Sequence, residues 1–178
     1  MAFEVEIKAR VADRAALEKI LRERYQRIEP FDKADIYFAS AADPARTSFR
    51  LRKEAGVWTV THKEKNVHDG IECNNELEFT VSDGDAFCAF AVRLGFFETL
   101  RKTKRGIVCA AGPDLNVELA TVGGLGDFVE IECLVARAED TDGARLKVRG
   151  MLDGLGVPAD SIEPRYYAEL LRGQNGRR

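Results

Sequence analysis

The stretch Phe3-Glu4-Val5-Glu6-Ile7-Lys8-Ala9-Arg10-Val11 alternates apolar and charged residues without a break. Successive side chains of a β-strand point to opposite faces of a sheet. The stretch therefore predicts a strand with one apolar and one charged face, and the charged side chains on that face repeat about every 7 Å. Taken alone, such a strand is typical of a sheet whose charged face meets solvent.

The same alternation recurs along the chain, and the charges are sorted by sign. The acidic pairs are Glu4/Glu6, Glu76/Glu78 and Glu130/Glu132, and the basic pairs are Arg50/Arg52, Lys63/Lys65 and Lys102/Lys104. A solvated surface needs no such order. If helices cover the apolar strand faces from outside, the charged faces line the interior of a closed barrel of about eight strands.

Helices are predicted after each acidic strand, where apolar residues recur at helical spacing. They are expected at residues 13–27, 83–95 and 141–155, with Asp13 capping the first and Ser82 or Asp83 the second. In the third helix, the apolar side chains are expected to face inward. These are Leu146, Met151, Leu152 and Leu155.

The remaining segments are predicted as strands, turns and a tail. A strand is expected at residues 34–39, an irregular polar segment at 66–74, and hairpin turns at 55–56 and 123–126. A short amphipathic segment at 165–171 closes the chain. We expect one domain over residues 1–172 and a frayed tail at 173–178.

Composition excludes several classes of protein. The chain has 178 residues, 45% of them hydrophobic and 32% charged, with a net charge of −3, which argues against a non-specific nucleic-acid binder. No apolar run approaches the ~18 residues that span a bilayer. Glu4 and Glu6 stand where an export signal needs apolar residues, and the four cysteines lack C-x-x-C spacing. We therefore expect a cytoplasmic protein with free thiols and no membrane partner.

The two signs of charge suggest a ligand for the barrel interior. Carboxylates a few ångströms apart raise one another's pKa unless a cation compensates them. Hard oxygen ligands favour Mg²⁺ or Mn²⁺. The opposing lysines and arginines suit a polyphosphate. The chain has no P-loop, and its two histidines, His62 and His68, are expected to be structural or exposed.

Ordered motifs along the chain resemble those of a known family. Glu4-x-Glu6-x-Lys8 resembles the E-x-E-x-K signature of the CYTH superfamily, the triphosphate tunnel metalloenzymes. Further resemblances follow in order at Phe49-Arg50-Leu51-Arg52, Thr61-His62-Lys63, Glu76-Leu77-Glu78, Lys102-Thr103-Lys104 and the segment 122–132. The tail Tyr166-Tyr167-Ala168-Glu169-Leu170-Leu171 resembles that of the class IV adenylyl cyclase branch.

This resemblance implies an α+β fold, a closed eight-stranded antiparallel β-barrel with a charged interior and helices outside. It also implies a bound triphosphate and two ions of Mg²⁺ or Mn²⁺. The implied metal ligands are Glu4, Glu6, Glu130 and Glu132, with Glu118 standing in for an Asp that cyclase-like members often carry where this chain has Ala120. The implied substrate-binding residues are Arg50, Arg52, Lys63, Lys65, Lys102, Lys104, Glu76 and Glu78, and the catalytic residues are Lys8, Glu6 and Glu132.

Three functions remain open at this stage. The resemblance, because it extends to the tail, favours a class IV adenylyl cyclase-like enzyme, which would convert ATP to cyclic AMP and pyrophosphate, over the two alternatives. A triphosphatase would hydrolyse tripolyphosphate, thiamine triphosphate or a nucleoside triphosphate, and Ala120 and the absence of a His-Phe pair before the E-x-E-x-K motif favour it. The third is a non-catalytic polyphosphate or nucleotide-binding module. A homodimer is one expected assembly.

Overall fold

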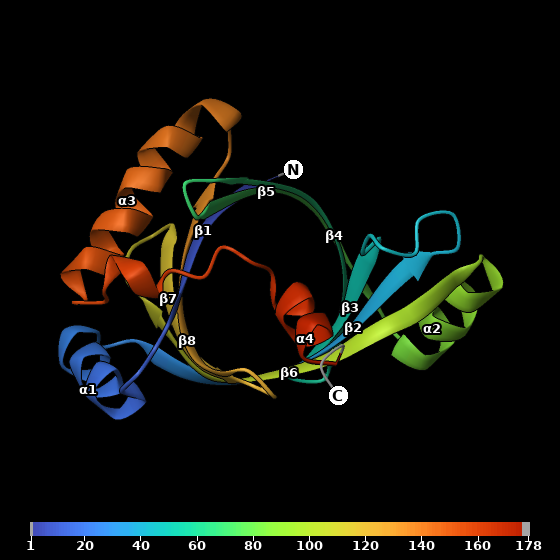
Figure 1. The fold of residues 1–178 in the computed structure, drawn as a ribbon, viewed down its shortest axis with the longest axis horizontal. Coiled ribbons are helices and arrows are strands. Elements are labelled where there is room, and N and C mark those ends of the chain that lie inside the picture. The colour runs from blue at the N-terminus through green and yellow to red at the C-terminus, as the bar shows by residue number, and fades with distance from the viewer. Residues whose placement is uncertain (1, 176–178) are drawn as a thin grey trace.

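Eight antiparallel strands close into a barrel in the order β1-β5-β4-β3-β2-β6-β7-β8 (Figure 1). The computed structural model describes residues 2–175, apart from the side chains of Ala2, Lys65 and Asn175. The strands are β1 (Ala2–Arg10), β2 (Ile28–Ser40), β3 (Phe49–Glu54), β4 (Val57–His68), β5 (Ile71–Val81), β6 (Phe96–Ala110), β7 (Leu115–Val122) and β8 (Gly126–Val135). The predicted α+β barrel is confirmed.

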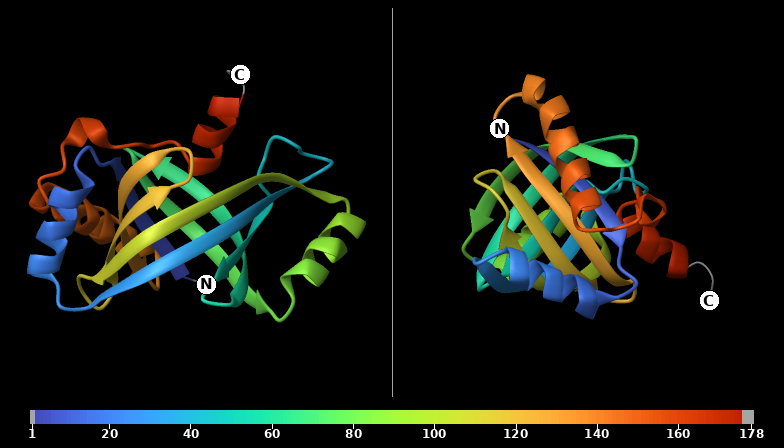
Figure 2. Two further views of the ribbon diagram at one scale, coloured as in Figure 1. Left: turned by 90° about the horizontal axis from the view of Figure 1, so that it is seen from below. Right: turned by 90° about the vertical axis from the view of Figure 1, so that its left-hand side faces the viewer.

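Helices follow the three acidic strands, as expected, and a fourth closes the described chain. They are α1 (Arg14–Arg24), α2 (Gly84–Arg93), α3 (Thr141–Gly154) and α4 (Tyr167–Asn175), with 3₁₀ turns at Ala138–Asp140 and Ala159–Ser161. Figure 2 shows α1 and α3 on one flank of the barrel and α2 on the other, while α4 lies across one end in Figure 1. Within residues 2–175, no helix is both long enough and apolar enough to cross a membrane.

Most apolar strand faces point outward beneath the helices, whereas Leu77 and Phe79 of β5 point outward and are 59% and 50% exposed. Val5, Ile7 and Ala9 of β1 are fully buried in a cluster that includes Leu21 of α1 and Leu152 of α3. Burying one such aliphatic side chain contributes about 1.5–3 kcal/mol. A second cluster joins Ile36, Phe38, Leu51 and Val60 of β2, β3 and β4 to Ala91 of α2. Because these faces are used outside, the charged faces are turned into the lumen.

Two local predictions about α3 and the β4–β5 hairpin are wrong. Leu146 does not face inward but is 77% exposed, because Ala144 and Val148 occupy the buried face and a residue two positions away points elsewhere on a helix. Residues 66–74 are not irregular: β4 and β5 meet at a tight Asp69-Gly70 turn, in which both residues have positive φ. Their polar composition reflects side chains that face the lumen or solvent.

Element ends also differ from the predicted ones. Strand β2 covers Ile28–Ser40, not 34–39, and α1 ends at Arg24, not near Arg27. Helix α4 continues to Asn175, beyond the expected end of ordered structure at Arg172, and residues 176–178 lie outside the described chain. The caps behave as expected, because Asp13 accepts a hydrogen bond from the Ala16 N–H and Asp83 from those of Asp85 and Ala86.

Candidate active site

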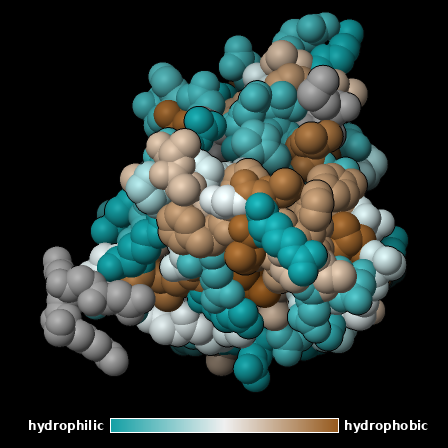
Figure 3. All heavy atoms as spheres, turned by 90° about the vertical axis from the view of Figure 1, so that its right-hand side faces the viewer, coloured by the Kyte–Doolittle hydropathy of each residue, from teal (hydrophilic) through white to brown (hydrophobic). Residues whose placement is uncertain are grey.

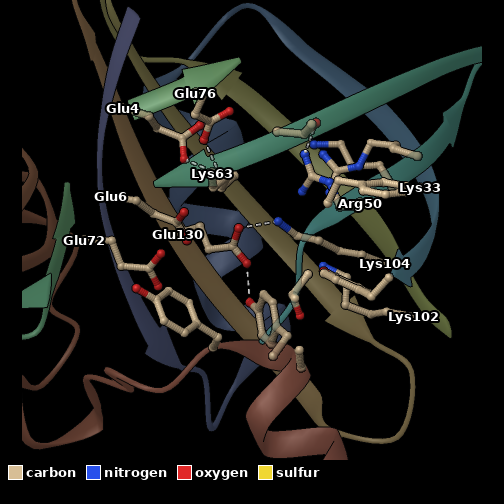
Figure 4. A pocket seen from close by; sticks show the side chains of 18 of the residues that line it. Glu4, Glu6, Lys33, Arg50, Lys63, Glu72, Glu76, Lys102, Lys104 and Glu130 are labelled. Carbon is tan, nitrogen blue, oxygen red and sulfur yellow. Dashed lines mark hydrogen bonds and ion pairs between the residues drawn. The ribbon is translucent and has the colours of Figure 1, made fainter. Parts of the chain in front are cut away.

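A cavity of about 440 Å³ occupies the barrel and is lined mainly by charged side chains. Figure 4 shows carboxylates from β1, β5 and β8 facing cations from β2, β3 and β6 across this space. The lining carboxylates are Glu4, Glu6, Glu72, Glu76, Glu78, Glu130 and Glu132, and the lining cations are Lys8, Lys33, Arg50, Arg52, Lys63, Lys102 and Lys104. The sequence-predicted residues therefore gather around one cavity, except Glu118, which does not line it, and Lys65, whose side chain lies outside the described residues.

Three carboxylates converge on one point of the cavity wall. Oxygens of Glu6, Glu130 and Glu132 all lie within 4.8 Å of one another. Strands β1 and β8 bring them together, because their register pairs Glu6 with Glu132 and Lys8 with Glu130. Among the residues that the structure describes, neither Glu6 nor Glu132 has a side-chain hydrogen bond or ion pair.

Electrostatics at this cluster favours a bound cation. Burial, together with the nearby carboxylates, raises the pKa of Glu6 well above its ordinary value and that of Glu132 to about 8. Glu130 differs from these two, because its contacts with Lys104 and Tyr167 lower its pKa despite burial. A divalent ion would compensate the negative charge that remains, and carboxylate oxygens are the ligands that Mg²⁺ and Mn²⁺ prefer. The residues present therefore fit a hard divalent cation held by Glu6, Glu130 and Glu132.

Glu4 and Glu118, which are also predicted to bind metal, lie outside this cluster and are paired with lysines. Glu4 accepts from Lys63 Nζ at 2.8 Å, and Glu118 is held between Lys33 and Lys104. Burial alone would raise both pKa values, but the lysines outweigh burial and hold each pKa at about 2. Both carboxylates are thus already compensated without a metal.

Glu76 and Glu78 line the cavity from β5, and each contacts a side chain of the neighbouring strand β4. Lys63 contacts Glu76, whose pKa is nevertheless raised to about 7 by burial and by the neighbouring Glu4. Glu78 accepts a hydrogen bond from Thr61 Oγ1 at 2.5 Å. Arg50 Nη2 of β3 donates to the same Thr61 oxygen at 3.0 Å, whereas Arg50 Nε is buried without a hydrogen-bond partner among the described residues. Arg50 therefore keeps a donor for an anion.

Sequence reasoning missed a carboxylate on the basic side of the lumen. Asp35 of β2 accepts from Arg52 Nε and Nη2 at 2.7 and 3.1 Å and lies 3.0 Å from Lys102 Nζ. Despite burial, these cations lower the Asp35 pKa. The alternation of Lys33, Asp35 and Tyr37 opposite apolar residues could have revealed it. The predicted strand began at residue 34, so Lys33 was left out of that pattern.

Glu72 was missed because its segment was expected to be irregular. It lies in register with Glu6 across β1 and β5 and is 3.1 Å from Lys8 Nζ. Burial would lower the pKa of Lys8, but Glu6, Glu72 and Glu130 raise it. Lys8 is therefore held as a cation at neutral pH.

Helix α4 places Tyr167 against the acidic cluster. Its hydroxyl donates to Glu130, and its ring centroid lies 4.9 Å from Lys8 Nζ and 4.8 Å from Lys102 Nζ. The ring also packs edge-on against Phe128, with the centroids 5.0 Å apart. The tail motif had indicated this segment by resemblance, but its contact with a candidate metal ligand appears only in the fold.

Ala120 lies on the lumen-facing row of β7, where it is almost fully buried. It is in register with Phe128 on β8 and with Gly106 on β6. A Cβ added to Gly106 would meet the Leu119 carbonyl oxygen at 2.1 Å, so this part of the barrel is closely packed. The nearest carboxylate on the same strand face, Glu118, is occupied by Lys33 and Lys104.

Comparisons with known proteins identify the family. A protein of Methanocaldococcus jannaschii provisionally named an adenylate cyclase is 26% identical over 94% of this chain and 98% of its own. A solved Pyrococcus horikoshii structure has a TM-score of 0.83 at 27% identity and covers 96% of this chain and 99% of its own. A Hippeastrum protein, provisionally named an adenylyl cyclase and described as having a dominant triphosphatase activity, has a TM-score of 0.68 at 17% identity, with 99% and 96% covered. The CYTH domain model matches residues 2–167, and the chain therefore belongs to the CYTH family.

Proposed function

We propose that this protein is a divalent-metal-dependent triphosphatase that hydrolyses a linear triphosphate inside the barrel. The observation that carries the proposal is the meeting of a carboxylate cluster, Glu6, Glu130 and Glu132, with cations on the opposite side of the same cavity. Within that cluster, Glu6 and Glu132 have no partner among the described residues, whereas Glu130 contacts Lys104 and Tyr167. An enclosed space with these two charged sides matches a polyphosphate chain that is bound together with a cation.

Each side of the lumen has a distinct part in this proposal. Glu6, Glu130 and Glu132 would hold the cation, and the bound cation would neutralise part of the phosphate charge. Arg50, Lys102 and Lys104 bind phosphate oxygens. Glu76 and Glu78 line the β5 side, where they position Lys63 and Thr61, respectively.

Lys8 is proposed to bind phosphate and not to act as a base. The three carboxylates around it raise its pKa, so it keeps its proton at neutral pH. In hydrolysis, a new P–O bond forms between water and the terminal phosphorus, the bridging P–O bond breaks, and the electron pair of that bond leaves with the diphosphate. The proton that the water loses passes to the released phosphates or to solvent. Lys8 can stabilise the negative charge that develops on the phosphate oxygens.

Hydrolysis is favoured over cyclisation by the surroundings of Ala120. Cyclase-like members that this chain resembles often carry a carboxylate there. The carboxylate expected to replace it, Glu118, is committed to two lysines. A triphosphatase needs only water as its nucleophile, so the lack of a free carboxylate on this part of β7 is no obstacle to it.

Cyclisation of ATP remains the second candidate, because the Methanocaldococcus relative carries an adenylate cyclase name. In that reaction the 3′-hydroxyl would attack the α-phosphorus and pyrophosphate would leave. The two reactions would use the same cation site and basic side but would place the phosphate chain in a different register.

Product analysis tests the proposal. The protein is incubated with tripolyphosphate and, separately, with ATP, each with Mg²⁺ or Mn²⁺ and with EDTA as control. We expect phosphate to be released in a metal-dependent reaction and lost in Glu132→Gln. Cyclic AMP as the main product from ATP would favour the second candidate. Calorimetric binding of tripolyphosphate without turnover at either metal would identify a binding module and contradict both reactions.

A further inference from the structure

The outer face of α2 carries apolar and charged side chains that nothing in the described chain covers. Val92 is 59% exposed beside Ala89, and Phe90 is 56% exposed on the other flank of the helix, since residues two positions apart point in different directions. Figure 3 views the molecule from the side on which α2 lies and shows apolar side chains gathered there among hydrophilic ones. A groove of about 450 Å³ runs beside the helix and is lined on the α2 side by Asp85, Ala89, Val92 and Arg93.

Two opposite charges on this face make no hydrogen bond or ion pair within the described chain. Asp85 and Arg93 are both exposed, and neither side chain makes a hydrogen bond or an ion pair with another described residue. Glu98 and Arg101 of β6, which line the other side of the same groove, instead pair with each other at 2.7 Å. Asp85 adds to the charge that raises the pKa of Arg101 but does not contact it.

The spacing of these charges is self-complementary. Asp85, Ala89 and Arg93 are each four residues apart, so they form one line along the helix. If two copies of α2 pack antiparallel about a two-fold axis at Ala89, Asp85 of one copy faces Arg93 of the other, and the reciprocal pair forms as well. The small side chain at Ala89 permits close approach at the crossing.

We propose that the α2 face is a homodimer interface, centred on Ala89 and fixed by two reciprocal Asp85–Arg93 ion pairs. The occupant is a second copy because the face matches itself in charge about its midpoint. In the two-fold pair, Val92 of one copy lies opposite Ala86 of the other, so a larger apolar side chain meets a smaller one. The adjoining groove gives room for side chains of the second helix.

Charge reversal tests the interface directly. The full-length protein, Asp85→Arg and Arg93→Asp are compared by sedimentation velocity over a range of concentrations. Each single reversal places like charges opposite each other twice, so we expect self-association at least about tenfold weaker than in the unaltered protein. Mixing the two variants restores both pairs in a heterodimer, and association is expected to return.

A matched control is available on α3. Asp142 also lies in the first turn of its helix and is exposed, so Asp142→Arg imposes the same change of helix-terminal charge without touching α2. It is expected to leave self-association unchanged. A chain that stays monomeric at all concentrations would overturn the proposal. So would a dimer that survives both single reversals, or variants that do not associate when mixed. None of these outcomes bears on triphosphate hydrolysis.

Discussion

The two sides of the lumen use carboxylates in opposite ways. On the basic side, Asp35 contacts Arg52 and Lys102, and Glu118 contacts Lys33 and Lys104. On the acidic side, Glu6 and Glu132 have no partner among the described residues, and burial raises their pKa values. The same residue type therefore stabilises the barrel where cations compensate it. Where they do not, it leaves a site that only a ligand can complete.

The largest effect is expected from removing a shared cation on the basic side. Lys104→Met leaves Glu118 with one lysine and Glu130 with none, so the free energy of unfolding should fall by about 3–5 kcal/mol. Urea denaturation measures the change. Arg105→Met, on the same strand but exposed, is the control and should change stability by less than about 0.5 kcal/mol. Equal effects of the two substitutions would contradict this account of the basic side.

On the acidic side, the expected loss is of function and not of stability. Glu132→Gln removes a proposed metal ligand that has no partner cation, so metal-dependent turnover should fall about 100- to 1,000-fold. The free energy of unfolding of the metal-free protein should stay the same or rise, because one source of repulsion between carboxylates is gone. Steady-state kinetics and urea denaturation are run on the same preparation. A variant that unfolds more easily but keeps its turnover would reverse the comparison.

A smaller effect is expected from removing Arg50, whose Nε has no hydrogen-bond partner among the described residues. Arg50→Ala should raise KM for triphosphate about 10- to 100-fold, because a charge-assisted hydrogen bond contributes about 1.5–3 kcal/mol. The unpartnered Nε is the reason to expect this loss in substrate binding. Lys53→Ala changes a cation on the same strand that lies over Trp58 outside the lumen, and its KM should stay within about twofold. Similar KM values for the two variants would place phosphate elsewhere.

The smallest effect is expected outside the lumen, where the C-terminal segment is tied to β1. Glu163 accepts from Arg165 at 2.7 Å and from Arg10 at 3.1 Å, and these partners lower its pKa to about 2. Because the pKa is lowered in the folded state, the ionised Glu163 stabilises the fold at pH values above 4.5, the ordinary pKa of Glu. This contribution is lost as the pH falls towards 2. Glu163→Gln should therefore cost about 1 kcal/mol at neutral pH, after screening by solvent, and almost nothing near pH 2. Thermal unfolding from pH 7 to 2 measures it, and a difference independent of pH would contradict the ion-pair account.

Several features of this protein were set by local sequence. Alternation in residues 3–11 specified a two-faced strand, and Asp13 and Asp83 specified helix starts, because strand period and capping depend only on neighbouring residues. The sorting of charges by sign indicated that the charged faces share an enclosed space. Leu146 shows the limit of this reasoning, since a helix of mixed polarity leaves more than one apolar stripe possible.

Only the tertiary structure decided which charges meet. The register between β1 and β8 places Glu6 beside Glu132, whereas in the closed barrel Lys104 of β6 contacts Glu118 of β7. Tyr167 reaches Glu130 from a helix at the other end of the chain. Sequence determined that carboxylates and cations would line the barrel, because alternation fixes the face of each side chain. The pairing of those charges depends on distances of a few ångströms between strands far apart in sequence, and barrel closure alone sets these distances.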